Sequence, residues 1–194
     1  MRLTQEESER NRKQILDVAG RLFRQRGFDA VSVDDLMKAA GFTHGGFYNH
    51  FASKAELVAE ASAAGAAEAR GALVDSLSDP RKDAWERFVR GYLSAEHRGD
   101  PACGCTLGAL AADAGRKGRA VQARFAEALE GMTRALGEYL ARKPSRGKRA
   151  RAHREGALQM LSELVGALVL ARAVAAANPA LSDEILAANR RGLR

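Results

Sequence analysis

Apolar residues recur every three or four positions along most of this 194-residue chain, in blocks separated by proline or glycine. Such spacing gives an α-helix one apolar face, whereas a half-buried strand alternates every second residue. Composition agrees, because Ala supplies 39 residues while Ile and Val supply only 2 and 10. We find no strand-period segment and no internal repeat. The sequence therefore predicts an all-α fold, long enough for one domain or two small ones.

Proline, glycine and capping residues mark the expected helix ends. Ser or Thr followed three residues later by an acidic residue predicts a capping box before the first, second and fourth helices. Gly27 and Gly41 are expected to end the first two. The expected helices cover residues 4–26, 33–40, a third from 43, 53–77, 85–92, 106–114, 121–140, 150–177 and 181–193.

Large aromatic residues are concentrated at the beginning of the chain. Five of the seven Phe lie in the first 51 residues, as expected of a three-helix unit of about 50 residues that must bury enough surface. The remainder is rich in Ala and Leu. We therefore expect an amino-terminal domain at residues 1–53 and a larger helical domain at residues 54–194.

A very short turn separates the second and third expected helices. Gly41 and Phe42 precede Thr43, which can cap the third helix. Gly41 would supply the positive φ of the turn, and Phe42 would fill the angle between the helices. This is the layout of a helix-turn-helix, in which the third helix enters the major groove of DNA.

Three sequence motifs extend the pattern. An Ala-Gly step at 40–41 is followed by a Tyr48-x-x-Phe51 step and then by Lys54 and Leu57, three residues apart. In these features the segment 32–57 resembles the amino-terminal domain of the TetR family of transcriptional regulators. The resemblance implies a homodimeric, one-component regulator, most simply a repressor, that a small-molecule effector releases from a palindromic double-stranded DNA operator.

The resemblance also implies which residues face DNA. Hydroxyl, imidazole and amide groups can bond base edges or phosphate oxygens, and helix amino termini attract phosphate. The residues expected to contact DNA are Ser32, Thr43, His44, Gly45, Gly46, Tyr48, Asn49, His50 and Lys54. Without the family pattern, Tyr48 and His50 would serve equally well as packed structural residues. Asp34 would either repel a phosphate or accept from a cytosine amino group, and both alternatives stay open.

Positive charge suggests nucleic acid as a partner but lies mostly elsewhere. The chain carries a net charge of +7, of which residues 1–54 supply +2 and residues 116–156 supply +8. The stretch 142–154 has seven basic residues and no acid. We interpret it as a solvated connection between helices. The alternative, from a different functional class, is a helical protein that binds nucleic acid nonspecifically through this stretch.

The second domain is expected to bind the effector and to dimerise. The resemblance implies an apolar effector pocket, although plain core packing explains the same residues. The candidate pocket residues are Trp85, Phe88, Tyr92, Leu110, Phe125 and Met132. The region 156–177 is apolar around most of its circumference and so needs a partner, which implies a four-helix contact between two copies. The candidate dimer residues are Leu161, Leu164, Leu168 and Ile185.

Cys103 and Cys105 stand too close in sequence for an ordinary disulfide. Because they precede an expected helix start, one alternative is a redox- or electrophile-sensing regulator of the same fold. Inert packing is the simpler interpretation. A thiol-dependent enzyme using Cys105 is a further alternative, but no nucleophile–base motif accompanies it.

The remaining expectations are negative. Residue spacing indicates neither a metal site nor a cofactor, and the chain is not expected to be an enzyme. The amino terminus lacks the apolar stretch of a secretory signal, and no uninterrupted apolar run approaches the roughly 20 residues of a membrane span. We therefore expect a cytoplasmic protein without a membrane partner.

Overall fold

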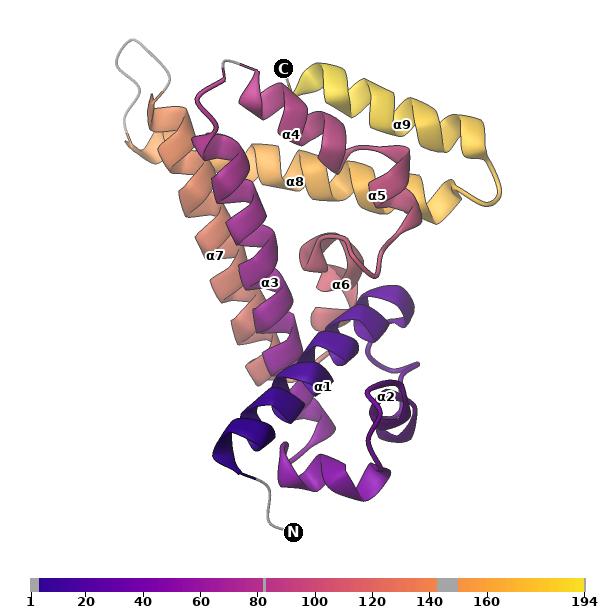
Figure 1. Ribbon diagram of the computed structural model, residues 1–194. Helices are drawn as coiled ribbons and strands as arrows, with labels where there is room; N and C mark the ends of the chain where they lie inside the picture. Colours follow the sequence, from indigo (N-terminus) through magenta and orange to yellow (C-terminus); the bar gives the residue numbers. More distant parts are fainter. Residues whose placement is uncertain (1–3, 82, 143–149, 194) are drawn as a thin grey trace. The chain divides into compact units, whose positions relative to one another are not determined.

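A computed structural model describes residues 4–81, 83–142 and 150–193, and every regular element in these ranges is helical (Figure 1). The all-α prediction is therefore confirmed. The elements are α1 (Gln5–Arg26), α2 (Val33–Ala39), the 3₁₀ helix η1 (His44–Asn49), α3 (Lys54–Ser78), α4 (Ala84–Tyr92), α5 (Ala95–Gly99), α6 (Thr106–Ala114), α7 (Arg119–Arg142), α8 (Ala150–Val174) and α9 (Pro179–Gly192).

Local capping explains where the first helices begin. At α1 the Thr4 side chain accepts from the Glu7 amide while the Glu7 carboxylate accepts from the Thr4 amide, and Ser32 and Asp35 repeat this box at α2. Both predicted boxes are confirmed. At α3 the Glu56 amide donates to the Ser53 hydroxyl (3.1 Å), as in a capping box. The Glu56 carboxylate, however, accepts from the amide of Ala52 rather than from that of Ser53. The start of α3 is thus capped in a shifted register.

Two elements differ from the predicted helices. The third is a short 3₁₀ helix, not an α-helix, and its first turn contains Gly45 and Gly46. Each glycine costs a helix interior about 1 kcal/mol, so a six-residue segment gains little from α-helical bonding. Helix α5 was not predicted, because five residues are too few to show a helical period.

The chain divides into two compact units. Unit 1 comprises residues 1–66 and 101–125, and unit 2 comprises residues 67–100 and 126–194. The division therefore falls within α3 and α7. Unit 1 is larger than the expected amino-terminal domain, because it also contains α6 and the start of α7.

Aromatic side chains form the core of unit 1. Phe23 lies edge-on to Phe28 with ring centroids 5.5 Å apart, and Phe28 lies edge-on to Phe125 at 6.5 Å. The buried rings of Phe47, in η1, and Phe51, just after it, have centroids 5.7 Å apart. All but Phe125 are at most 2% exposed. The concentration of Phe in this part of the sequence therefore reflects its core.

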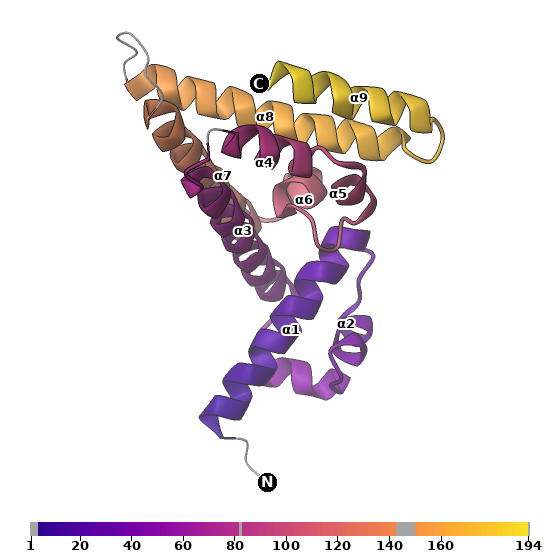
Figure 2. The ribbon, with the colours of Figure 1, turned by 45° about the horizontal axis from the view of Figure 1, so that its top comes forward.

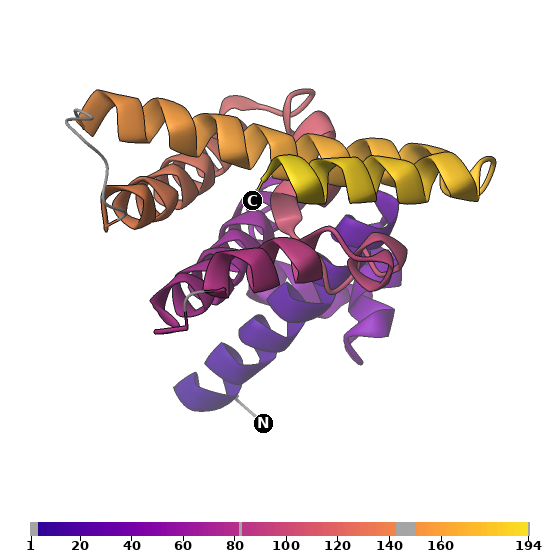
Figure 3. The same ribbon diagram turned by 90° about the horizontal axis from the view of Figure 1, so that it is seen from above.

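Helices α8 and α9 lie side by side in unit 2 (Figures 1 and 3). Leu164, Leu168 and Leu186 are buried where they pack. Helix α5 also contacts α8 (Figure 2), and Arg172 on α8 donates to the carbonyl oxygens of His97 (2.6 Å) and Arg98 (3.2 Å). Unit 2 is thus closed by both apolar packing and hydrogen bonds.

By length and composition, the stretch Arg151–Val174 of α8 would be able to cross a membrane. Core helices of soluble proteins pass the same test, so this observation carries little weight. In the structure α8 packs along α9 and contacts α5. Its apolar character is therefore partly explained by packing within unit 2.

Candidate nucleic-acid interface

A tight turn joins α2 to η1. The amide of Gly41 donates to the carbonyl of Lys38 (3.0 Å), and the amide of Phe42 donates to that of Met37 (2.8 Å). Gly41 has φ +81°, a conformation that residues with a Cβ rarely adopt, although no atom lies within 4 Å of an added Cβ. Backbone conformation rather than lack of space thus requires glycine here, as the sequence predicted.

Helix η1 has a buried side and an exposed side. Phe47 points inward and is 1% exposed, with its ring 5.2 Å from that of Tyr48. Tyr48 itself is 66% exposed. The exposed residues of this segment are Thr43, His44, Gly45, Tyr48 and Asn49. One short helix, anchored by a single phenylalanine, therefore presents five of the nine predicted DNA-contacting residues.

The other four predicted residues are less free. The Ser32 hydroxyl is already engaged with Asp35 as the cap of α2. Gly46, His50 and Lys54 are half-buried. The Nδ1 atom of His50 is buried without a hydrogen-bond partner, and burial, together with nearby Arg12, lowers the pKa of its imidazole. These positions suit phosphate approach better than base contact.

Asp34 is paired rather than isolated. Its carboxylate lies 2.8 Å from Lys38 Nζ and 4.0 Å from His44 Nδ1. The Lys38 ammonium group beside it offsets its repulsion of a phosphate.

Side chains of helix α1 contact the end of α2, the Phe51 ring and α3. The sequence pattern did not reveal these contacts. Arg12 binds the Glu60 carboxylate on α3 (2.6 Å) and lies 4.7 Å over the Phe51 ring. Gln14 donates to the carbonyl of Ala40 at the end of α2 (2.8 Å). The partners in these contacts are 26 to 48 residues apart in the sequence. Helical periodicity relates only residues three or four positions apart, so it cannot predict such contacts.

Comparison with known proteins identifies this region. Residues 15–61 match the family described as "Bacterial regulatory proteins, tetR family". The chain is 46% identical over 59 residues to the HTH-type transcriptional regulator AcrR of Shigella flexneri. This match covers 30% of this chain and 27% of AcrR. The chain is also 33% identical over 96 residues to the repressor KstR2 of Mycobacterium tuberculosis, and this match covers 44% of each of the two chains.

The amino-terminal region of the chain, residues 15–61, belongs to the TetR family. The chain's sequence matches span less than half the length of these relatives. The relatives are named as transcriptional regulators, in agreement with the expectation that the chain is not an enzyme.

Solved structures extend the likeness to the whole fold. Reduced NemR of E. coli matches with a TM-score of 0.78 and 19% identity, covering 95% of each chain. A TetR transcriptional regulator of Legionella pneumophila matches with a TM-score of 0.75 and 21% identity, covering 100% of this chain and 97% of that one. At such identities the likeness concerns the fold alone.

Helix α6 is attached to α1 and to the loop that follows it, within unit 1. Arg24 on α1 donates to the carbonyl of Ala102 (2.7 Å), and Lys117 pairs with Asp29 in the loop after α1. The Phe28 amide donates weakly to Asp113 (3.4 Å). Contacts at both ends of α6 thus explain why residues 101–125 belong to unit 1.

The predicted effector residues fall in both units. Leu110 and Phe125 are buried in unit 1, and Met132 is buried in unit 2. Trp85, Phe88 and Tyr92 lie in unit 2 in one row, with successive ring centroids 5.7 and 5.8 Å apart. Phe88 and Tyr92 line a cavity of about 310 Å³, together with Ser76, Asp79, Ala84, Arg87 and Gly91.

Three predicted dimer residues, Leu161, Leu164 and Leu168, are already buried within one copy of the chain, and Ile185 is half-buried. The apolar residues that α8 and α9 leave exposed are instead Leu158, Val169, Leu170 and Leu181. Leu181 stands one turn before Ile185 and so lies on the same face of α9. The choice of helices for dimerisation stays a prediction, but its contact residues need this revision.

Cys103 is exposed and Cys105 is buried at the N-cap of α6, and no disulfide joins them within the described residues. Cys103 is therefore the accessible thiol for the alternative of cysteine-based sensing. That alternative stays a prediction. Among the described residues, no cluster of three His, Cys, Asp or Glu is arranged to hold a metal ion.

Part of the basic stretch, residues 143–149, lies outside the described residues. Of its described members, Arg154 binds Glu130 through two hydrogen bonds (2.7 and 2.8 Å). Arg151 binds Glu155 (3.0 Å), and Arg142 approaches the carbonyl of Glu138. These arginines have partners within the chain, which agrees with a structural role for this part of the stretch.

Proposed function

We propose that this chain is a sequence-specific DNA-binding transcriptional regulator, and that it acts as a homodimeric repressor in the cytoplasm. The observation that carries the proposal is η1, which presents Thr43, His44, Tyr48 and Asn49 to solvent while Phe47 anchors it. A short exposed helix following a tight turn is the element that helix-turn-helix proteins insert into the major groove. The names of AcrR and KstR2, as regulator and repressor, support the same function.

The proposed contacts divide into base recognition and phosphate binding. His44, Tyr48 and Asn49 have exposed polar groups that can reach base edges. Gly45 and Gly46 let the backbone approach the groove closely. Lys54 begins α3, where its charge and the helix amino terminus both attract a phosphate.

Dimerisation follows from the surface that α8 and α9 leave exposed. Leu170 is 59% exposed, and Leu158, Val169 and Leu181 are each at least 40% exposed. Adjacent apolar helices of this kind pair with a second copy through a two-fold interface. Two copies would then read a palindromic operator.

The effector site is proposed around Phe88 and Tyr92. Their cavity of about 310 Å³ falls within the size range of small-molecule pockets and combines aromatic rings with Asp79 and Arg87. An effector bound there would favour the conformation with lower operator affinity.

Selection of bound sequences from a random DNA pool tests the proposal. The expected result is a palindromic motif, since a two-fold dimer presents two identical recognition helices. Enrichment of no motif, with equal binding to unrelated duplexes, would support the nonspecific alternative.

Two variants sharpen this test. Asn49→Ala should relax base preference at one position of each half-site, at about 1–3 kcal/mol. Lys54→Ala should instead weaken binding to all sequences alike and reduce the salt dependence. If both variants changed affinity in the same sequence-independent way, the proposed role of η1 in base recognition would be wrong.

A further inference from the structure

A second cavity lies in unit 2, and it shares no lining residue with the cavity beside Phe88 and Tyr92. Residues of helix α4 and of the end of α9 line a cavity of about 520 Å³. Its apolar wall includes Val89 and Leu193, both at most 6% exposed. Its volume lies in the range of small-ligand sites. The cavity is therefore large enough for a small organic molecule.

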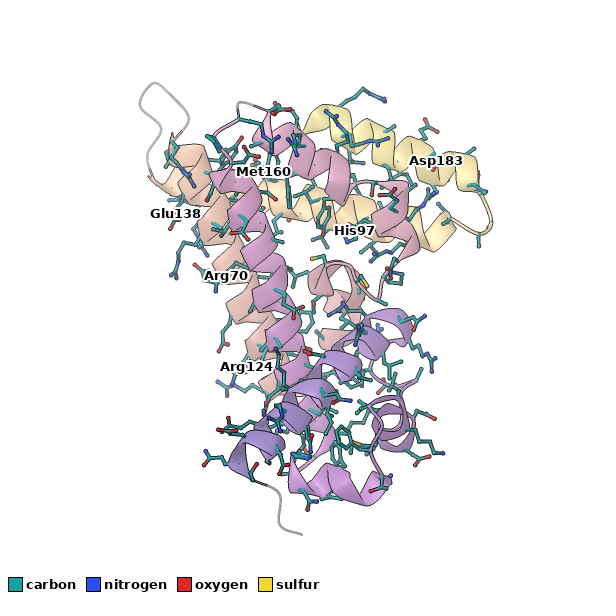
Figure 4. The ribbon with its side chains drawn as sticks, in the orientation of Figure 1. Arg70, His97, Arg124, Glu138, Met160 and Asp183 are labelled. Carbon is teal, nitrogen blue, oxygen red and sulfur yellow. The ribbon has the colours of Figure 1, made fainter. Side chains whose placement is uncertain are left out.

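Positive charge dominates the lining. Arg90 comes from α4, and Arg190 and Arg191 come from α9, against the single carboxylate of Glu86. Within the described ranges, none of the three guanidinium groups has a carboxylate at ion-pair distance. Arg98, elsewhere in unit 2, binds Ser182 (2.6 Å) and Asp183 (2.7 Å). Asp183 is labelled on α9 in Figure 4. The cavity arginines thus retain donors for an anion.

Glu86 adds a second requirement. Its Oε2 atom is buried and has no hydrogen-bond partner among the described residues. A buried acceptor without a donor is costly, so such atoms usually find a partner. Arginines in the last turns of α4 and α9 are expected from the helix dipoles alone, but the buried Glu86 oxygen is not. A ligand with a donor would satisfy it.

We propose that this cavity binds a small apolar carboxylate that carries a hydroxyl or amino group beside the carboxylate. The guanidinium groups of Arg90 and Arg190 bind the carboxylate through paired hydrogen bonds. The adjacent hydroxyl or amino group donates to Glu86, and the apolar body lies against Val89 and Leu193. This site is separate from the proposed effector site, and the proposal does not depend on DNA binding.

The chain contains its own reporter for this site. Trp85 is its single tryptophan, and the indole Nε1 donates to the carbonyl oxygen of Leu193 in the cavity wall. A ligand that packs on Leu193 is expected to change the environment of that indole. Tryptophan fluorescence therefore complements calorimetry.

A ligand series on the unaltered full chain, without DNA, tests the chemistry. The probes are 2-hydroxy-4-methylpentanoate, L-leucine, 4-methylpentanoate and 3-methylbutylamine. The hydroxy or amino acid should bind at least about tenfold more tightly than 4-methylpentanoate, which leaves Glu86 without a donor. The amine alone should not bind. Failure of all four probes to bind, equal binding of the three carboxylates, or preferred binding of the amine would overturn the proposal.

Variants locate the binding. Arg90→Ala and Arg190→Ala should each weaken the preferred probe by about tenfold or more, because a charge-assisted pair is lost. Arg90→Lys keeps the charge but not the planar fork, and should give a smaller loss. Glu86→Met should remove the preference over 4-methylpentanoate. Arg134→Ala, at an exposed position of α7, is the matched control and should leave binding unchanged.

Thermal melting without ligand identifies any variant that fails to fold, and the ligand series on the unaltered chain decides the proposal in that case. If Arg134→Ala weakened the preferred probe as much as Arg90→Ala does, the effect would be general electrostatics. The cavity would then not be the site.

Discussion

Four phenylalanines of unit 1, Phe23, Phe28, Phe47 and Phe51, are at most 2% exposed. In unit 2, Trp85 is equally buried, but Phe88 and Tyr92, which continue its row, are half-buried and line a cavity. The aromatic rings of unit 1 thus pack in its core, whereas two aromatic rings of unit 2 line a cavity. The difference suits a rigid DNA-presenting unit and a unit able to admit a ligand.

Truncating one aromatic residue in each unit should expose this contrast most strongly. Phe47→Ala should reduce the free energy of unfolding by about 3–5 kcal/mol, because it empties a fully buried site. Phe88→Ala, at a half-buried position, should cost less than about 2 kcal/mol. Urea unfolding followed by helix circular dichroism measures both. A larger loss for Phe88→Ala would mean that the row is core rather than a cavity wall.

Two glycines of α3 allow a second, more local comparison. A Cβ added to Gly65 in unit 1 would lie 2.5 Å from Thr106 Oγ1 and 2.8 Å from a terminal nitrogen of Arg24. Thr106 is 1% exposed and has little room to move, so Gly65→Ala should destabilise the chain by about 1–3 kcal/mol.

Gly71, on the same helix but in unit 2, is the matched control. No atom lies within 4 Å of its added Cβ. Gly71→Ala should stabilise the chain by about 0.5–1 kcal/mol through helix propensity. Thermal melts of both variants test the pair, and equal shifts of either sign would contradict close packing at Gly65.

Local features of unit 1 were predictable from sequence because neighbouring residues determine them. The capping boxes at Thr4 and Ser32 and the positive φ of Gly41 each depend on contacts within a few positions. The residues expected to face DNA came instead from the resemblance to the TetR family. Five of these nine residues are exposed in the segment 43–49, and their contact with DNA stays a prediction.

Other features depend on residues far apart in the chain. The bond from Arg24 to Ala102, 78 positions away, helps to attach α6 to unit 1, and helical periodicity cannot reveal such a partner. Likewise, an apolar residue such as Leu164 looks equally suitable for a dimer contact or for the protomer core. Only its burial within one copy of the chain distinguishes the two roles. The cavity of Arg90 and Arg190 was missed for the same reason.

Ion pairs in the two units should differ in their contribution to stability. Arg12 in unit 1 is about one-third exposed, and it both pairs with Glu60 and lies over the Phe51 ring. Arg12→Ala should therefore cost about 1 kcal/mol. Arg154→Ala, which removes the exposed pair with Glu130 in unit 2, should cost less, and its effect should vanish at high salt. Urea titrations at low and high salt compare the two. A larger, salt-independent loss at Arg154 would reverse the expected order.

The smallest expected effect is a pH dependence from two histidines whose pKa is lowered, His50 in unit 1 and His97 in unit 2. Burial lowers the pKa of His97 in unit 2, despite the bond between its Nδ1 and the Tyr92 carbonyl oxygen (2.6 Å), and burial also lowers the pKa of His50 in unit 1. The unfolded chain takes up these protons near pH 6.5, whereas the folded chain resists them. Stability should therefore be constant with respect to these groups above pH 6.5 and fall as the pH drops below it.

His97→Asn separates the contributions of the two histidines. Asparagine can still donate to the Tyr92 carbonyl but does not titrate, so this variant should lose less stability between pH 7 and pH 5 than the unaltered chain. Carboxylates titrate alike in both proteins, which isolates the histidine in the difference. Trp85 fluorescence during urea unfolding reports on unit 2, where it and His97 both lie. If His97→Asn left the pH dependence of that transition unchanged, desolvation of His97 would not contribute to the stability of unit 2.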